Sequence, residues 1–371
     1  MGLINNMLLN NNYFIDPDIR KAETLPAEFY RSEEIFQAVK DKIFTKCWHL
    51  AGDMDVVKIP GAVYPFTLLE GFLDEPLLLT RDQQDEIHCL SNVCTHRGNI
   101  LVENPDIIRL MQCRYHGRRF ELDGCFKSMP ECEDAINFPR KEDNLSKVPF
   151  ELWNNFIFTS LDPAKPFSGI SKVIDDRLDG VKIGEMMHEP TRSRDYLVKC
   201  NWALYVENYL EGFHIPYVHS GLNEKVDYGT YTTELYDYCN LQLAFSKPGE
   251  ECFRLHEISP DYGNEVAAYY WWIFPNMMLN YYPWGLSINI IRPLAKDMTK
   301  VSFITYVSDH SKLDKGAGSG LDRVEREDEA IVEMVQRGMQ SRYYSRGRYS
   351  PKREQGVHHF HRLLTQLLNE E

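Results

Sequence analysis

The sequence lacks three features, and each absence argues against a class of protein. No run of apolar residues approaches 18 in length, so the sequence predicts no membrane-spanning helix. Lysine and arginine (41) are outnumbered by aspartate and glutamate (55), and the formal charge of −14 argues against a nucleic-acid-binding surface. The first residues have neither the basic nor the long apolar region of a secretory signal peptide. We therefore expect a cytoplasmic protein that binds neither membranes nor nucleic acids.

A framework of disulfide bonds is also missing. The nine cysteines are an odd number without regular spacing, which favours free thiols in a reducing cytoplasm. The composition, 43% hydrophobic and 26% charged, is typical of a soluble globular protein. A length of 371 residues allows two or three domains of ordinary size.

Two closely spaced cysteine–histidine pairs are the most informative feature that is present. Cys94 and His96 are separated by one residue. Sixteen residues then intervene before Cys113 and His116, which are separated by two. A zinc ion could also take two cysteines and two histidines, but zinc fingers normally pair like ligands. Mixed pairs on two short loops favour a [2Fe–2S] cluster of the Rieske type, in which one iron takes both cysteines and the other both histidines. Glycines next to both pairs let the backbone approach the sulfides closely.

A second candidate site lies within residues 201–219. Aromatic and apolar residues at helical spacing predict a helix, which Gly212 and Pro216 end. Glu211 and His214 are three residues apart, so both can face one side of its last turn, and His219 follows the break. We interpret the two histidines as half of an iron site. Two hydrogen-bonded core histidines are the alternative.

The third ligand is predicted on a helix over residues 321–343. Its apolar stripe contains Asp328, while the other charged residues lie beside or opposite the stripe: Asp322, Glu325, Arg326, Glu327 and Glu329. A carboxylate on a buried helix face is unfavourable unless it is paired or binds a metal. An ion pair with a buried arginine would satisfy Asp328. With two histidines unassigned, a facial triad of two histidines and one carboxylate around Fe(II) is the better interpretation.

Together these motifs resemble the catalytic α subunits of Rieske non-haem iron oxygenases. Four residues match the family's cluster motif and three match its iron ligands: Cys94, His96, Cys113 and His116, then His214, His219 and Asp328. The resemblance implies a homotrimer in which His116 of one subunit reaches the iron site of the next through a bridging acid. Glu211 holds that position, where ring-dihydroxylating members usually carry aspartate. A glutamate there is similar to the carnitine and choline monooxygenase branch.

The fold expected from these patterns is α+β. An N-terminal segment, residues 1–45, is expected to pack on the catalytic domain, and residues 46–160 are expected to form a small antiparallel β domain that carries the Rieske cluster. Its strands are predicted at 63–69, 76–80, 87–93 and 156–160. Residues 161–371 are expected to form the catalytic domain with the mononuclear iron. Strands of an antiparallel sheet are predicted there at 231–245, 267–274, 286–293 and 301–307, and the resemblance implies a helix-grip fold.

The resemblance also implies a reaction. A separate NAD(P)H-dependent reductase, of flavin or ferredoxin type, supplies electrons, and the protein uses O2 to hydroxylate a small substrate, with Glu211 as the catalytic acid that holds the imidazoles of His116 and His214. We expect a quaternary ammonium compound of the carnitine, choline or betaine type, with C–N cleavage. The alternatives are hydroxylation, dihydroxylation or demethylation of a small aromatic acid, and a Rieske electron-transfer protein without oxygenase activity.

Aromatic residues crowd one region of the predicted sheet: Tyr269, Tyr270, Trp271, Trp272, Tyr281, Tyr282 and Trp284. Their faces could enclose a quaternary ammonium group by cation–π attraction, stack on an aromatic ring, or fill a core. Because alternate residues of a strand point to opposite sides, at most two or three of them can share a pocket.

Overall fold

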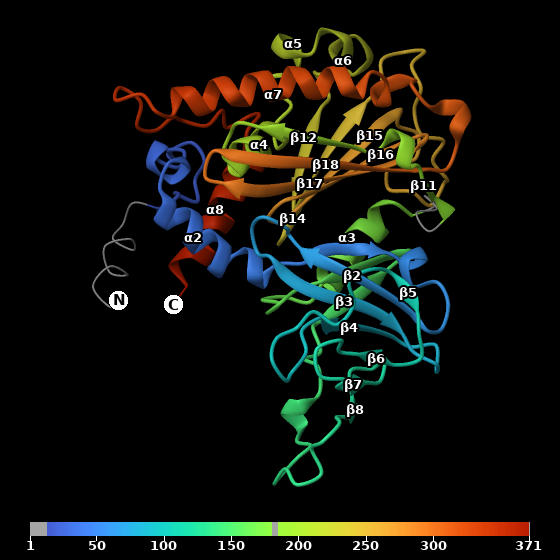
Figure 1. The fold of residues 1–371 in the computed structure, drawn as a ribbon. Coiled ribbons are helices and arrows are strands. Elements are labelled where there is room, and N and C mark those ends of the chain that lie inside the picture. Colours follow the sequence, from blue (N-terminus) through green and yellow to red (C-terminus); the bar gives the residue numbers. More distant parts are fainter. Residues whose placement is uncertain (1–12, 180–184, 371) are drawn as a thin grey trace. The chain divides into compact units, whose positions relative to one another are not determined.

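The computed structural model describes residues 13–179 and 185–370, and the chain divides into two compact units (Figure 1). One unit is Thr45–Phe167, and the other combines Met1–Phe44 with Ser168–Glu371. The second boundary therefore lies a few residues after the one expected at residue 160. Residues 1–12 of the expected N-terminal segment lie outside the described residues. No helix in the two described ranges is long and apolar enough to cross a membrane.

The unit Thr45–Phe167 consists of short antiparallel strands in three sheets, ordered β1-β10-β9, β4-β3-β2-β5 and β6-β7-β8. The strands are β1 (His49–Asp53), β2 (Ala62–Leu68), β3 (Glu75–Arg81), β4 (Ile87–Ser91), β5 (Asp106–Ile107), β6 (Met111–Gln112), β7 (Arg119–Phe120), β8 (Phe126–Ser128), β9 (Phe150–Trp153) and β10 (Phe156–Thr159). Leu78, Leu90 and Phe120 are buried in one core cluster together with Cys94 and Cys113. The predicted small antiparallel β domain is confirmed.

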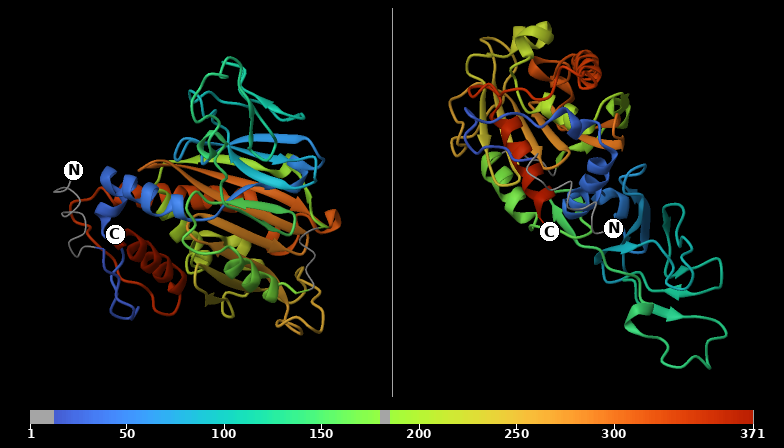
Figure 2. Two further views of the ribbon diagram at one scale, coloured as in Figure 1. Left: turned by 90° about the horizontal axis from the view of Figure 1, so that it is seen from below. Right: turned by 90° about the vertical axis from the view of Figure 1, so that its left-hand side faces the viewer.

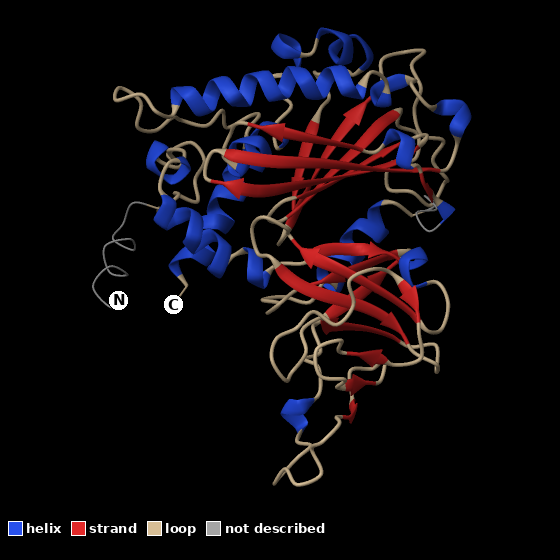
Figure 3. Cartoon of the chain, viewed as in Figure 1, coloured by secondary structure: helices blue, strands red, loops and turns tan. Residues whose placement is uncertain are grey.

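The larger unit contains an antiparallel sheet, drawn in red in Figure 3. Its strand order is β11-β18-β17-β16-β15-β14-β13, with β12 also paired to β18. The strands are β11 (Met187–His188), β12 (Arg194–Val198), β13 (Thr232–Leu235), β14 (Cys239–Phe245), β15 (Val266–Ile273), β16 (Met277–Tyr282), β17 (Gly285–Ala295) and β18 (Met298–Val307). The single strand predicted at 231–245 is a hairpin of β13 and β14, because the chain turns at residues 236–238. Strand β16 was not predicted.

The α-helices of the described residues are α2 (Glu33–Lys42), α3 (Ser168–Arg177), α4 (Trp202–Tyr209), α5 (Ile215–Val218), α6 (Ser220–Lys225), α7 (Leu321–Gly338) and α8 (Gln355–Asn369). Helix α2 begins after Ser32, whose hydroxyl accepts the N–H of Ile35 (3.3 Å). Helix α7 lies along the sheet in Figure 1 and contacts α4. It ends at Gly338, before the predicted end at Tyr343, since glycine is a poor helix former. The predicted α+β class is confirmed.

Helix α4 is held from both terminal parts of the chain. The hydroxyl of Tyr30 donates to Oε1 of Glu207 (2.7 Å), and Nε2 of His361 lies 3.0 Å from the same oxygen. Helices α2 and α8 contact each other (Figure 2). Nζ of Lys42 donates to the carbonyl oxygen of Leu368 (3.1 Å). The described part of the N-terminal segment therefore packs within the larger unit.

Candidate metal centres and pocket

The two Cys–His loops of the smaller unit have the same backbone pattern. In the first, the Cys94 N–H donates to the carbonyl oxygen of Asn99 (2.8 Å), and the Gly98 N–H donates to that of Cys94 (3.0 Å). The second repeats these bonds and distances, from Cys113 to Arg118 and from Gly117 to Cys113. Gly98 and Gly117 have φ values of 69° and 72°, a conformation that other residues rarely adopt. Two matched loops can present their ligands as a symmetric pair.

The side chains of these loops fit a two-iron cluster. Cys94 and Cys113 are each 2% exposed, and the rings of His96 and His116 lie 4.7 Å apart. Nδ1 of His96 is buried and has no hydrogen-bond partner among the described residues, as expected for an atom that binds a metal. In the described chain, no three of these residues bring their ligand atoms within 4.8 Å of one another. One tetrahedral zinc ion would need closer ligand atoms, so this spacing favours two irons over zinc.

A buried ion pair ties the loops together. Nη2 of Arg118 donates to Oδ1 (2.8 Å) and to the carbonyl oxygen (3.0 Å) of Asp143, and the hydroxyl of Thr95 donates to the same carbonyl (2.8 Å). The Arg118 guanidinium also lies over the ring of Phe126 and holds the pKa of the Asp143 carboxyl below its usual value. The sequence analysis missed this pair, whose members are 25 residues apart.

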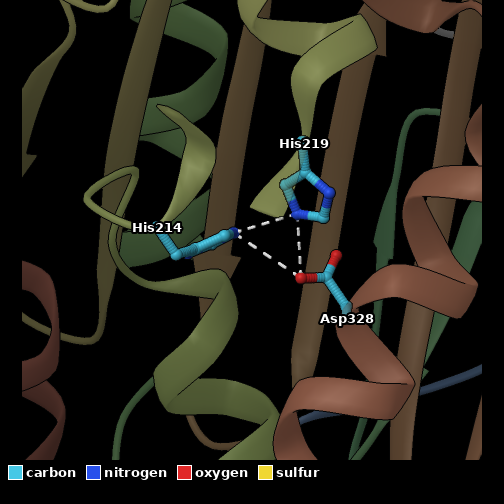
Figure 4. A group of neighbouring side chains, drawn as sticks. All are labelled: His214, His219 and Asp328. Carbon is cyan, nitrogen blue, oxygen red and sulfur yellow. Dashed lines mark hydrogen bonds and ion pairs between the residues drawn. The ribbon is translucent and has the colours of Figure 1, made fainter. Parts of the chain in front are cut away.

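In the larger unit, His214, His219 and Asp328 come together as predicted from the sequence (Figure 4). The two Nε2 atoms lie 3.1 Å apart, and Oδ1 of Asp328 lies 3.0 Å from Nε2 of His219 and 3.5 Å from that of His214. Two metal bonds of about 2.1 Å at a right angle separate their ligand atoms by about 3.0 Å. The triangle therefore has the size of one face of a six-coordinate metal ion.

Two glutamates hold the imidazoles by their other nitrogen atoms. Oε1 of Glu211 lies 2.7 Å from Nδ1 of His214, and its Oε2 accepts the backbone N–H of His214 (3.0 Å). Oε2 of Glu327 lies 2.8 Å from Nδ1 of His219. A histidine that donates Nδ1–H to a carboxylate presents Nε2 to a metal in a fixed orientation. The residues present therefore fit an iron ion.

The local backbone around these residues differs from the prediction. Helix α4 ends at Tyr209, so Glu211 and His214 lie in the turn before α5 rather than in the last turn of a helix. Pro216 stands at the start of α5, where its missing N–H is tolerated, and does not end a helix. Asn208, in the last turn of α4, donates through Nδ2 to Oδ1 of Asp328 (2.6 Å).

Two acids of α7 have roles that the sequence analysis did not assign. Glu327 was placed beside or opposite the apolar stripe, yet it contacts His219, and this contact lowers its pKa. Glu325 is only 7% exposed and accepts a hydrogen bond from the hydroxyl of Tyr205. Burial raises the pKa of Glu325 well above its usual value. Its spacing of three from Asp328 was the available signal for a shared helix face.

A cavity of about 120 Å³ adjoins the triad. Its sheet wall contains Tyr270, Asn280 and Ser287, which are cross-strand neighbours on β15, β16 and β17. Helices α4 and α7 contribute Tyr205 and Glu325. Among the described residues that line the cavity are three acids and no lysine or arginine.

Strand alternation decides which of the clustered aromatic residues reach the cavity. Tyr270 and Tyr282 line it, whereas Tyr269, Trp271 and Tyr281 are fully buried and do not. Strand geometry predicted that at most two or three of the seven aromatic residues share a pocket, and two of them line this cavity.

Comparison with known proteins covers both units. A family model described as the ring hydroxylating alpha subunit (catalytic domain) matches residues 185–370, and one described as the Rieske [2Fe-2S] domain matches residues 47–139. The chain is 30% identical over 370 residues to a chloroplastic choline monooxygenase of Arabidopsis thaliana, covering 94% of this chain and 84% of that protein. It is 27% identical over 390 residues to the carnitine monooxygenase oxygenase subunit of Escherichia coli K12, covering 98% of each.

Solved structures agree with these matches. A quaternary ammonium Rieske monooxygenase in complex with L-carnitine superposes with a TM-score of 0.73 at 21% identity, covering 94% of this chain and 97% of that one. Naphthalene 1,2-dioxygenase from Rhodococcus sp. superposes with a TM-score of 0.72 at 18% identity, covering 94% and 95%. At these identities the two structures establish a shared fold.

Proposed function

Because this chain belongs to the Rieske non-haem iron oxygenases, with a Rieske [2Fe-2S] domain and a ring-hydroxylating catalytic domain, we propose that it hydroxylates a small quaternary ammonium compound. The candidate substrates are choline, carnitine and betaines. The relatives named above are a choline and a carnitine monooxygenase.

The charge of the cavity carries this proposal. The described lining contains Glu211, Glu325 and Asp328 but no lysine or arginine, so a substrate carboxylate would meet no cationic side chain there. Burying a carboxylate without an opposite charge is unfavourable, which argues against an aromatic acid and, among the candidates, favours choline over carnitine and betaines, because these two also carry a carboxylate. An ammonium group would instead meet acids and the tyrosine faces of Tyr270 and Tyr282.

Each candidate residue has a proposed role. Cys94, Cys113, His96 and His116 hold the [2Fe–2S] cluster, and His214, His219 and Asp328 hold Fe(II). When bound, these groups supply single electrons and the activation of O2. Glu211 and Glu327 orient the two imidazoles, and Asn208 orients the Asp328 carboxylate. The enclosing tyrosines keep bulk water away from the bound substrate.

The overall reaction consumes one O2, two electrons and two protons. One oxygen atom is inserted into a C–H bond and the other leaves as water. Where the new hydroxyl is on the carbon bonded to nitrogen, the hydroxyl proton leaves, a carbonyl forms, and the C–N bond breaks with the electron pair going to the departing amine. The predicted C–N cleavage follows this course.

The partners and the location are part of the proposal. A separate reductase supplies electrons from NAD(P)H, and the chain works as a homotrimer in which Glu211 bridges to His116 of a neighbouring subunit. The solved structure of one relative, a quaternary ammonium Rieske monooxygenase, gives insight into inter-subunit electron transfer in that protein. A reducing location, such as the cytoplasm, is supported by the nine cysteines, all of which lie in the described ranges without a disulfide bond.

Oxygen consumption tests the proposed function. The purified protein, with a surrogate reductase and NADH, is given choline, L-carnitine or glycine betaine, and in parallel benzoate or salicylate. We expect substrate-dependent O2 uptake only with a quaternary ammonium compound, together with a released amine or aldehyde detected by mass spectrometry. O2 uptake only with the aromatic acids would contradict the proposal. An Asp328→Ala variant serves as the negative control for O2 uptake.

A further inference from the structure

Glu325 is the cavity acid with no role in holding the triad. Glu211 contacts His214 and Asp328 contacts His219, whereas the hydrogen-bond partner of Glu325 within the described ranges is the hydroxyl of Tyr205. Neither lysine, arginine nor histidine forms an ion pair with Glu325 in the described chain. Its side chain is nonetheless almost fully buried. An ionised carboxylate that is buried without a positive partner destabilises the fold. Protein stability therefore does not explain why an acid stands at position 325.

The position of Glu325 suits contact with a ligand. It lines the cavity beside the triad and also an adjoining cavity of about 490 Å³, and the two cavities share Ser287, Phe303, Leu321 and Glu325. A ligand in either cavity can therefore contact this carboxylate. The four shared residues come from β17, β18 and α7, so regular secondary structure fixes their positions.

A quaternary ammonium group cannot donate a hydrogen bond, so a protein must recognise it by charge and by aromatic faces. Tyr270 and Tyr282 supply faces, and Glu325 can supply the charge. Without a bound cation, burial raises the pKa of Glu325 and favours its neutral form. A bound cation lowers that pKa again by supplying the opposite charge, so the carboxyl group ionises as the substrate binds. Tyr205 donates to the carboxylate and thereby fixes its orientation.

On these grounds, and resting on the proposed function, we propose that Glu325, oriented by Tyr205, is the specificity-determining residue that selects a positively charged substrate over a neutral one of the same shape. Its partner is the trimethylammonium group of the substrate. We expect the residue not to be required for binding iron, because within the described chain it forms no hydrogen bond or ion pair with any of the three candidate ligands.

The test compares choline with 3,3-dimethylbutan-1-ol, in which a neutral carbon replaces the charged nitrogen. Calorimetry on the anaerobic, metal-loaded protein measures Kd for both. We expect the wild-type protein to prefer choline by at least about tenfold, since pairing a buried charge is worth that much or more. Glu325→Gln keeps the shape and the hydrogen bond from Tyr205 and is expected to reduce the preference to within about threefold. Glu325→Asp keeps the charge and should therefore retain part of the preference for choline.

A matched control removes a charge outside the cavity. Glu224 is exposed on α6, two residues from the cavity-lining Leu222, and Glu224→Gln should leave the preference unchanged. The cluster absorption and the iron content of each variant show that it is folded. A wild-type preference that survives Glu325→Gln, or an absence of charge preference in the wild type, overturns the inference. A wild-type protein that binds neither choline nor L-carnitine contradicts the proposed function instead.

Discussion

Gly212 lies between the two residues that form the Glu211–His214 contact, and replacing it by alanine is a sharp test of the site. A Cβ at this position would lie 2.8 Å from Cε1 of Tyr231 and 3.0 Å from Cδ1 and Cζ. Carbon atoms in contact normally stay about 3.5–4.0 Å apart, so the new methyl group would be at least about 0.7 Å too close to the ring. Because the hydroxyl of Tyr231 donates to Gln242, the ring is not free to move away.

We expect two effects of Gly212→Ala. Overpacking of this kind costs about 1–3 kcal/mol, which should lower Tm by roughly 2–10 °C in scanning calorimetry for a unit of this size. Displacement of the turn should also lengthen the Glu211–His214 contact. Loss of such a partner lowers metal affinity about 10- to 100-fold, measured as iron per chain after dialysis against a chelator. The cluster absorption should be unchanged.

Gly221→Ala is the matched control, because a Cβ there meets no atom within 4 Å and the residue is part of helix α6. That variant should keep its iron, and its Tm should be unchanged or a few degrees higher, because alanine favours the helix over glycine by up to about 1 kcal/mol. If Gly212→Ala matched Gly221→Ala in both iron content and Tm, the argument that this turn positions His214 would be refuted.

Three further variants test other parts of the sites. Asp328→Ala should bind no mononuclear iron while its cluster absorption stays intact, and loss of the cluster as well would show that Asp328 is misassigned. Glu327→Gln should lower iron affinity about 10- to 100-fold in a chelator competition, because His219 loses a charged acceptor; unchanged affinity would count against that contact. The pKa of Asp143 is lowered in the folded protein, so its pairing with Arg118 stabilises the fold above the unfolded pKa of about 4 and ceases to do so as the pH falls through the lower folded value. Asp143→Asn should therefore reduce unfolding stability at neutral pH and make it less dependent on acid pH, which urea titrations followed at several pH values would check.

The parts of the sites that were visible in the sequence are those built by local spacing. Both Cys–His pairs lie on single tight loops, so their spacing was enough to suggest the cluster. Asp328 was identifiable because a carboxylate in an apolar stripe needs an explanation, and the structure places it beside the two histidines.

What remained hidden depends on contacts between distant elements. Periodicity placed Glu325 and Glu327 off the apolar stripe of α7, but their partners, Tyr205 and His219, belong to segments more than a hundred residues earlier. No pattern in one element reveals which residue of another will face it. The Arg118–Asp143 pair was missed for the same reason. Strand β16 was overlooked because its residues are all buried and show no alternation of polar and apolar side chains.

Helix α4 connects the ends of the described chain to the metal centre. Its Glu207 accepts a hydrogen bond from Tyr30 of one terminal region and lies 3.0 Å from His361 of the other. The next residue, Asn208, donates a hydrogen bond to Asp328, the candidate iron ligand. We therefore expect fusion tags or deletions that disturb either region to change the candidate iron site, although neither Tyr30 nor His361 lines the pocket. If a preparation of the protein has a low iron content, the tags and deletions at its two ends should be examined first.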